Sequence, residues 1–254
     1  MIYCIILFLL LIFLAVYFRL YLFVFPKNRL IILMYHQIEK ESHEGLTVSL
    51  TNLEQQFEYL NKKKYKSTFF SELNTLGKKS IILTFDDGYK NNFDYLPPLL
   101  EKYNLKATIF IPTKFIQEGY EDFAMMSFED IRNLNKKYFE IALHSHNHQN
   151  FRNISTDFIK NDLETNMQIL DNERIKYSKV LAYPYGKYPK KNPEKEKVFS
   201  VLKNLGIDFA VRIGNKVNYF PTNQPYELCR IDIKGKDSLL KFKLKLIFGR
   251  LKLF

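Results

Sequence analysis

The sequence predicts an α/β fold in which parallel strands alternate with helices. Short apolar runs bounded by turn residues, such as 80–83 and 107–111, are typical of buried strands. Amphipathic stretches such as 49–64 separate them and carry apolar residues at helical spacing. Strands that alternate with helices favour a parallel sheet with helical crossovers, and a barrel of this kind places reactive side chains at the carboxyl ends of its strands.

The expected strands and helices alternate from residue 29 to residue 233. The helix at 93–103 contains Pro97 and Pro98, so we expect it to begin late or to be broken. Ser127 and Asp130 have capping-box spacing and predict the start of another helix. The expected strands are 29–35, 80–83, 107–111, 139–143, 179–183, 207–211 and 226–233, and the expected helices are 49–64, 93–103, 127–137, 156–173 and one that ends at Gly206.

The first 25 residues are predicted to form an uncleaved transmembrane helix. No charged residue occurs from Ile2 to Phe18, and the apolar run resumes after Arg19. This is long enough for a bilayer, which needs about 20 residues. Neither the basic start nor the cleavage site of a signal peptide is visible. We therefore expect a single-pass protein of the cell (inner) membrane, and the basic flank after the span favours a cytoplasmic location for the domain that follows.

The rest of the chain is predicted to form one domain and a short basic tail. With 38 Lys and Arg against 27 Asp and Glu, the net charge is +11. The lysines are spread along the chain without a nucleic-acid-binding motif, so nucleic acid is not an expected partner. Cys4 and Cys229 indicate no disulfide framework. We divide the chain into an anchor at 1–25, a domain at 26–236 and a basic amphipathic segment at 237–254.

The segment 237–254 has two interpretations that the sequence leaves equal. It could lie at a membrane surface as a basic interfacial helix, or it could pack on the barrel as a last helix. Its predicted apolar face contains Leu240, Leu244, Ile247, Phe248 and Leu251, with Lys241, Lys245 and Lys252 elsewhere.

Two adjacent carboxylates follow the strand at 80–83, in the sequence Thr84-Phe85-Asp86-Asp87-Gly88. Neighbouring side chains of an extended segment point to opposite sides, so Asp86 and Asp87 can take different partners. One could hold a metal while the other handles protons. The alternative is a solvated turn, because Asp-Gly is a common turn pair.

Three of the five histidines lie in His144-Ser145-His146-Asn147-His148, directly after the strand at 139–143. Imidazole nitrogens and a carboxylate make a zinc-type ligand set, and three protein ligands leave a coordination position for water. His144 and His148 are four residues apart, which places them on one face of either a helix or a strand. Surface histidines in a polar loop are the alternative.

Together these segments resemble the polysaccharide deacetylase family, the carbohydrate esterases with a NodB homology domain. The sequence at 84–88 matches its first motif, T-F-D-D-G, without a change, and 144–148 matches its second, H-[ST]-x-x-H. The resemblance extends to 33–36, 182–186 and 227–231, and the most similar branch is the poly-β-1,6-N-acetylglucosamine deacetylases. It implies a distorted (β/α) barrel of the NodB type with about seven strands, here preceded by the transmembrane helix.

The resemblance also implies an activity and the residues that perform it. A divalent metal, expected to be zinc, would be held by Asp87, His144 and His148. Asp86 would be the general base, and the backbone N–H of Tyr185 would bind the oxyanion. The reaction would remove N-acetyl groups from N-acetylhexosamine residues of a cell-surface or lipid-linked glycan.

The sequence lacks two residues that many members of this family have. Many members carry the general acid in a late Leu-x-x-x-His motif, but no histidine follows His148 here. His36 matches the position of a histidine in the poly-N-acetylglucosamine branch, and imidazolium is a suitable donor to a leaving amine. The family arginine before the Pro-Tyr pair is also missing, so Arg230 is the first candidate to orient Asp86 and Arg212 the second.

Other functions remain open at the level of sequence. The enzyme could be a deformylase or an esterase that acts on another acylated sugar, or the protein could be an inactive, membrane-anchored relative that binds glycans. Intact residues at all the metal and base positions count against the inactive relative. We expect a monomer whose partners are the membrane and an N-acetylated glycan or lipid-linked sugar. Because the deacetylases of this branch work outside the inner membrane, the side of the catalytic domain stays undecided.

Overall fold

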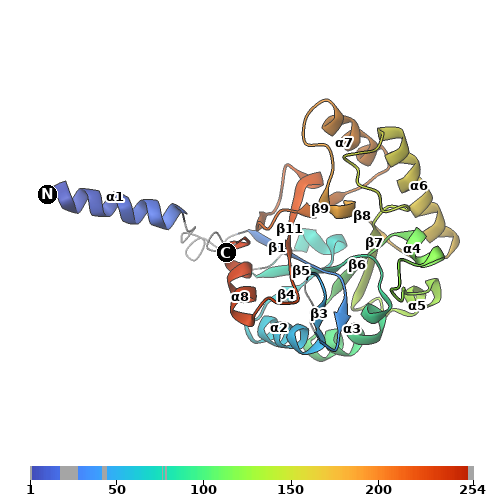
Figure 1. Ribbon diagram of the computed structural model, residues 1–254, viewed down its shortest axis with the longest axis horizontal. Coiled ribbons are helices and arrows are strands. Elements are labelled where there is room, and N and C mark those ends of the chain that lie inside the picture. The colour runs from blue at the N-terminus through green and yellow to red at the C-terminus, as the bar shows by residue number, and fades with distance from the viewer. Residues whose placement is uncertain (1, 18–27, 42–44, 76, 78, 251–254) are drawn as a thin grey trace.

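The centre of the molecule is a closed barrel of seven parallel strands surrounded by helices (Figure 1). The structure is a computed structural model that describes residues 2–17, 28–41, 45–75, 77 and 79–250. The expected α/β barrel is confirmed, and each predicted strand is present with its ends shifted by a few residues at most. Its strands are β1 (Arg29–Tyr35), β5 (Ser80–Phe85), β6 (Ala107–Ile111), β7 (Phe139–Leu143), β8 (Ser178–Ala182), β9 (Phe209–Ile213) and β11 (Leu228–Asp232).

The barrel closes because β1 has a strand on each side. It pairs with β5 from Ile31 opposite Ile81 to Tyr35 opposite Phe85, and with β11 at Leu33 opposite Ile231. The last strand, β11, therefore lies between β1 and β9. Short strands extend the sheet at β4 (Lys66–Ser67) and β10 (Asn218–Tyr219), and β2 (Ile38–Glu39) pairs with β3 (Val48–Ser49) in a separate sheet.

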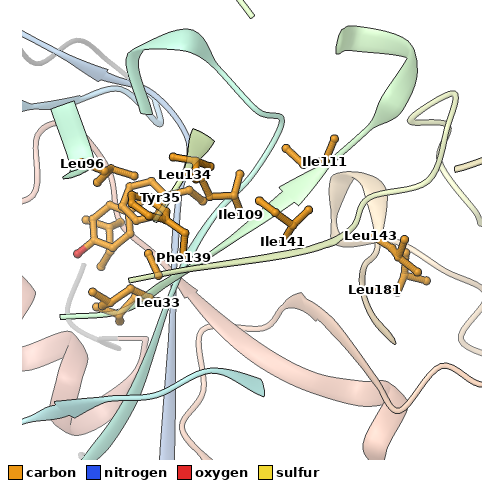
Figure 2. Close-up of a cluster of buried hydrophobic side chains, with 14 of the residues drawn as sticks. Leu33, Tyr35, Leu96, Ile109, Ile111, Leu134, Phe139, Ile141, Leu143 and Leu181 are labelled. Carbon is orange, nitrogen blue, oxygen red and sulfur yellow. The ribbon is translucent and has the colours of Figure 1, made fainter. Parts of the chain in front are cut away.

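Alternate side chains along the strands point into the barrel and out toward the helices, so they belong to two separate apolar clusters. One cluster includes Leu30, Ile32 and Ile82 and fills the barrel interior. The other includes Ile31, Leu33 and Ile81 and packs against the surrounding helices; Figure 2 shows part of this outer cluster. Both layers are buried, which explains why the strands are continuous apolar runs.

Helices cover the outside of the barrel (Figure 1). The structure has the predicted capping box at Ser127 and Asp130, and the helix that it opens is short. The helix with Pro97 and Pro98 is neither late nor broken, which corrects our expectation: it runs from Lys90 to Tyr103. The helices are α2 (Leu50–Lys62), α3 (Lys90–Tyr103), α4 (Thr113–Glu118), α5 (Phe128–Asn133), α6 (Thr156–Asn172), α7 (Glu194–Asn204) and α8 (Leu239–Phe248).

A short 3₁₀ helix, η2 (Phe70–Thr75), closes the amino-terminal end of the barrel. Its Phe70 and Leu73 side chains join the interior cluster. Glu140 of β7 accepts hydrogen bonds from the backbone N–H groups of Phe70 and Ser71, and from the hydroxyls of Ser71 and Thr108. The amino-terminal end of the barrel is therefore filled by side chains, and only the carboxyl-terminal end can hold an active site.

The predicted transmembrane anchor is not supported. The N-terminal helix α1 covers Ile2–Tyr17, which is 16 residues. Within the described ranges, no helix is both long and apolar enough to cross a membrane. The prediction of a single-pass inner-membrane protein was therefore wrong, and residues 18–25 of the proposed anchor lie outside the described part of the chain.

The C-terminal segment packs on the barrel side, as the second of its two interpretations expected. In α8, Phe242 is fully buried and meets the Tyr59 ring of α2 edge-on, with 6.3 Å between ring centroids. The predicted apolar face was right at Phe248, which is buried, but wrong at Leu240, which is 67% exposed. Phe242, Lys245 and Leu246, which the prediction left outside this face, are buried. Leu251 and Lys252 lie outside the described residues.

Candidate active site

Five of the predicted site residues meet at the carboxyl ends of neighbouring barrel strands. His36 follows β1, Asp86 and Asp87 follow β5, and His144 and His148 follow β7. Because β1 pairs with β5, and β6 alone separates β5 from β7, residues far apart in the sequence reach one place. The predicted convergence is present in the structure.

Asp87, His144 and His148 form a buried cluster with the dimensions of a metal site. The Oδ1 atom of Asp87 lies 3.4 Å from Nε2 of each histidine. All three candidate ligand atoms lie within 4.8 Å of one another. Asp87 Oδ1 is buried, and no group in the described part of the chain makes a hydrogen bond to it. A buried carboxylate oxygen normally has a hydrogen-bond partner. A cation bound between Asp87 Oδ1 and the two imidazole nitrogens would provide the missing interaction.

The backbone fixes the tautomer of His144. Its Nδ1 lies 2.8 Å from the carbonyl oxygen of Ala182 at the end of β8. A carbonyl can only accept, so Nδ1 carries the proton and the lone pair of neutral His144 is on Nε2, the atom that faces Asp87. Metal-binding histidines are commonly oriented in this way.

Burial and neighbouring charges set the ionisation of the cluster. Burial alone would raise the pKa of Asp87, but the close contact with His144 and the charges that His36, His144 and His148 carry when protonated lower it. Burial, followed by the charge of His144, lowers the pKa of His148 to about 4. Asp87 is thus an anion and His148 a neutral imidazole near neutral pH, which are the forms that bind metals.

Arg230 holds Asp86 in a bidentate ion pair inside the barrel. Its two terminal nitrogens donate to the two carboxylate oxygens at 2.5 and 2.6 Å. Burial alone would raise the pKa of Asp86, but the charges of Arg230, His144 and His36 outweigh it and lower the pKa. The first candidate for this contact is therefore in place. Arg212, the second candidate, donates to the carbonyl oxygen of Ile213 instead.

His36 lies beside both carboxylates. Its Nε2 atom is 3.8 Å from Asp86 Oδ2 and 3.9 Å from Asp87 Oδ2, and 16% of its side chain is exposed. A partly exposed imidazole at this distance can reach a substrate that lies over the cluster. Tyr35, its neighbour, is turned away: the Tyr35 hydroxyl donates to Gln56 at 2.8 Å in the outer layer.

Four site residues have left-handed backbone conformations. The φ angles are 73° at Asp87, 64° at Ser145, 53° at His148 and 58° at Tyr185. Such conformations cost about 1–2 kcal/mol per non-glycine residue. The segment 144–148 is accordingly a curled loop, neither the helix nor the strand that the four-residue spacing suggested. The two histidines converge because the loop turns back on itself.

Tyr185 lies on the rim of the site, beyond β8. Its side chain is 55% exposed, and its ring centroid is 4.8 Å from that of His148. Phe115 and Tyr120 continue this aromatic rim on the other side of His148. They line a hollow of about 600 Å³ with His148 and Tyr185.

Tyr89 is a residue of the site that sequence reasoning missed. It is 5% exposed and its hydroxyl lies beside Asp87 and Gln37, so burial, followed by the charge of Asp87, raises its pKa. A second hollow of about 600 Å³ begins at Gln37 and Tyr89 and is lined by four acidic side chains. The sequence feature that could have identified Tyr89 is its position directly after Asp87-Gly88, at the start of α3. His146 points elsewhere and contacts Thr113, and His43 lies outside the described residues.

The fold and the cluster define a class of protein: a (β/α)-barrel hydrolase with an Asp/His/His centre and an adjacent, arginine-held carboxylate. The sequence profile of the family described as polysaccharide deacetylase matches residues 73–210, more than half of the chain. The chain belongs to the polysaccharide deacetylase family, whose members are hydrolases that act on amide bonds. Deacetylases of this kind are generally metal-dependent.

Individual relatives agree with this assignment. Poly-beta-1,6-N-acetyl-D-glucosamine N-deacetylase of Staphylococcus aureus (strain MRSA252) is 23% identical over 237 residues, covering 82% of this chain and 79% of the relative. YxkH of Bacillus subtilis (strain 168), named for the same family, is 26% identical over 167 residues. That match covers 63% of this chain and spans 58% of the relative's length.

Solved structures share the fold. The Streptococcus pyogenes deacetylase PplD in complex with acetate superposes with a TM-score of 0.74 at 22% identity, covering 86% of this chain and 98% of PplD. IcaB from Ammonifex degensii gives a TM-score of 0.74 at 20% identity, covering 87% and 98%. The resemblance predicted from the motifs is thus confirmed at the level of family and fold.

Proposed function

We propose that this protein removes N-acetyl groups from N-acetylhexosamine residues of a glycan in a metal-dependent reaction. The single observation that carries the proposal is the buried cluster of Asp87, His144 and His148 beside the Asp86–Arg230 pair. A ligand set and a separate, ionised carboxylate are the two parts that hydrolysis of an unactivated amide needs.

The roles follow from what each side chain contacts. A divalent cation held by Asp87, His144 and His148, which we propose to be zinc, would supply Lewis acidity toward the amide carbonyl and toward water. Asp86, kept ionised by Arg230, would accept the proton of the attacking water. His36 would donate a proton to the leaving amine.

The oxyanion would be bound on the side of the site opposite the proton donor. Tyr185 ends the loop that follows β8, and its left-handed conformation is set within the tight turn at 184–186. Its backbone N–H is the donor that the family motif assigns to the developing oxyanion. The exposed ring beside His148 offers a flat surface to a sugar.

A glycan chain, rather than a small amide, is the substrate that the surface supports. One hollow borders the cluster at His148 and Tyr185, and the other borders it at Gln37 and Tyr89. Both are open and are lined by polar and aromatic side chains, as expected for sugar rings on either side of the reacting residue. The Staphylococcus aureus relatives named for a poly-N-acetylglucosamine substrate make β-1,6-linked polymers the first substrate to test.

The experiment measures acetate released by the purified protein from N-acetylglucosamine oligomers and from lipid-linked N-acetylated sugars, before and after chelation and zinc repletion. Acetate release that a chelator abolishes and zinc restores is the expected result. Formylated and O-acetylated sugars are the comparison substrates, because a faster reaction with them would indicate a deformylase or an esterase. Glycan binding without any acyl release would contradict the proposal.

A further inference from the structure

The metal-ligand loop at 144–148 is anchored on helix α6, which belongs to no known motif of the site. The loop needs an anchor because Ser145 and His148 both have left-handed backbone conformations, which isolated chains rarely adopt. Within the loop, the Ser145 hydroxyl accepts from the His148 N–H at 3.1 Å. His144 is also held by the carbonyl oxygen of Ala182, and Lys114 donates to the Asn147 side chain at 3.4 Å. Two buried residues of α6 add further support, one by a direct contact with the loop and one through Thr113.

The first anchor is Asp162, in the second turn of α6. Its Oδ1 atom accepts two hydrogen bonds from Asn147, one from the backbone N–H and one from the side-chain amide, each at 2.8 Å. Asp162 is 3% exposed, so these bonds form away from water, and a charged acceptor strengthens them. Asn147 directly precedes the ligand His148, and its backbone position therefore determines where that imidazole begins.

The second anchor is Asn166, four residues further along the same face of α6. Its side-chain amide donates to the hydroxyl of Thr113 and to the carbonyl oxygen of Ile111, both at 3.1 Å. Since the Thr113 hydroxyl accepts from Asn166, its own proton is available to Nδ1 of His146 at 3.0 Å. Asn166 thus connects the end of β6 to the middle of the ligand loop and is fully buried.

We propose that Asp162 and Asn166 are positioning residues that hold the 144–148 loop in its metal-binding conformation. The proposal rests on the metal site of the proposed function. It adds that metal binding needs the contacts from α6 as well as the three ligands. Without these anchors, the loop would have to be ordered when the metal binds, and metal affinity would fall by the cost of that ordering. Loss of groups that orient metal ligands typically weakens metal binding by about 10–100-fold.

The test uses Asp162→Leu, which removes both acceptor oxygens and puts an apolar side chain in their place. Zinc affinity of the metal-free protein is measured by calorimetry, and loop order by amide hydrogen exchange at residues 144–148. Glu164→Leu is the matched control, because Glu164 lies on the exposed face of the same helix in an ion pair with Lys160. Asp162→Asn is the rescue variant, since one oxygen already accepts both bonds and an amide retains one oxygen.

We expect Asp162→Leu to weaken zinc binding about 10–100-fold and to speed exchange in the loop, with Asp162→Asn and Glu164→Leu near wild type. Asn147→Ala, which removes one of the two bonds without altering α6, should be intermediate and covers the case in which Asp162→Leu does not fold. Unchanged affinity and exchange in both Asp162→Leu and Asn147→Ala would overturn the proposal. If the wild-type protein binds no zinc, the metal assignment fails, and loop exchange alone decides whether α6 positions the loop.

Discussion

Asp86 and Asp87 are neighbours in the chain that have entirely different partners. Asp86 points into the barrel and is held by both terminal nitrogens of Arg230, whereas Asp87 faces His144 and His148. The left-handed φ of 73° at Asp87 turns the chain between them. This separation is what the proposed division of roles requires, with one carboxylate as the base and its neighbour as a ligand of the cation, and substitution can test it.

The two carboxylates should respond differently to substitution. Asp87→Ala, His144→Ala and His148→Ala should each lose bound metal and activity together, because each removes one of three ligands. Asp86→Asn should retain metal and lose turnover, since the amide cannot accept the proton of water. Metal content by mass spectrometry and acetate release measure the two properties on the same samples. An equal loss of metal in Asp86→Asn would refute the division of roles.

His36 should matter more for amides than for esters. A positioned general acid contributes about 10²–10⁴-fold, and a leaving amine needs its proton more than a good alkoxide or phenolate does. His36→Ala should therefore retain metal and fold, lose most turnover on an N-acetylated sugar, and hydrolyse an activated acetate ester nearly as well as wild type. Equal slowing of both substrates, or of neither, would show that His36 is not the acid. Tyr35 could not replace it, because its hydroxyl is bound to Gln56.

Arg230 should contribute to stability as well as to catalysis. Arg230→Met would leave the buried Asp86 carboxylate without its partner, and breaking a buried pair on one side costs about 3–5 kcal/mol. The free energy of unfolding, from urea denaturation, should fall by that amount, and Asp86→Leu in the same chain should restore much of it. Arg212→Met is the matched control, because Arg212 makes no contact with Asp86. A loss of similar size in the control would refute the argument.

At the residue scale, sequence predicted identities better than geometry. The motifs named Asp86 and the three residues of the buried cluster, and the resemblance to the poly-N-acetylglucosamine branch named His36. The choice of Arg230 over Arg212 could not be derived from the pattern, because the two lie on adjacent strands and only the barrel interior distinguishes them. Side-chain alternation places Arg230 inside beside Phe110, with 5.3 Å from guanidinium carbon to ring centroid. That alternation depends on register, which the sequence does not state.

At the scale of elements, burial decided which predictions succeeded. The strands 29–35 and 107–111 were predicted to the residue, because an apolar run buried on both faces ends where the burial ends. The rule that proline interrupts a helix gave a wrong prediction for the helix with Pro97 and Pro98. Each proline inside a helix costs about 3 kcal/mol of helix stability. Burial of Leu96, Leu99 and Leu100 stabilises the folded helix by about 1.5–3 kcal/mol each, which is enough to offset the cost of the two prolines.

Helix α6 carried a signal that sequence reasoning could have used. Its buried face contains Asp162 and Asn166, spaced four residues apart, among Leu163, Met167 and Leu170. Polar residues on an apolar stripe are costly unless they have partners, so they indicate a contact with another segment. The partner itself could not be predicted, because the ligand loop comes from before the helix and reaches it only in the folded barrel.

The α8 region should make stability depend on pH. Asp237 accepts from Lys245 at 2.5 Å in a buried pair. Burial alone would raise the pKa of Asp237, but the bonds from Lys245, Lys234 and Lys241 lower it below its usual 3.8. A lowered folded pKa means that the stabilisation is complete above the unfolded pKa and is lost as the pH falls through the folded one.

Asp237→Asn should therefore lower the free energy of unfolding by about 1.5–3 kcal/mol at neutral pH, as expected for a hydrogen bond between charged groups. The difference from wild type should shrink as the pH falls below 3.8 and through the lowered pKa of Asp237, where the wild-type carboxylate also becomes protonated. Chemical denaturation over this pH range measures both. Asp208→Asn is the control, since Asp208 is exposed. A difference that does not change with pH would contradict the assignment.

At the scale of the whole molecule, motif order and strand count predicted the barrel and its family. The N-terminal segment was misjudged because the apolar run alone was taken to predict a membrane span, whereas no helix among the described residues is both long and apolar enough to form one. Hydropathy measures composition, and a membrane span also requires one uninterrupted helix of sufficient length.

Ring closure by the last strand has a consequence for synthesis. While the chain is being made, β9 and most of β1 remain open edges of an incomplete sheet until β11 pairs with both of them, because β10 pairs with β1 only at Arg29 and Leu30. Both sequence motifs of the site have left the ribosome by then, but Asp86 still has no guanidinium partner, because Arg230 arrives on β11. A nascent chain that stops before residue 228 thus carries Asp86 and all three residues of the buried Asp87, His144 and His148 cluster, and lacks the cation that pairs with Asp86.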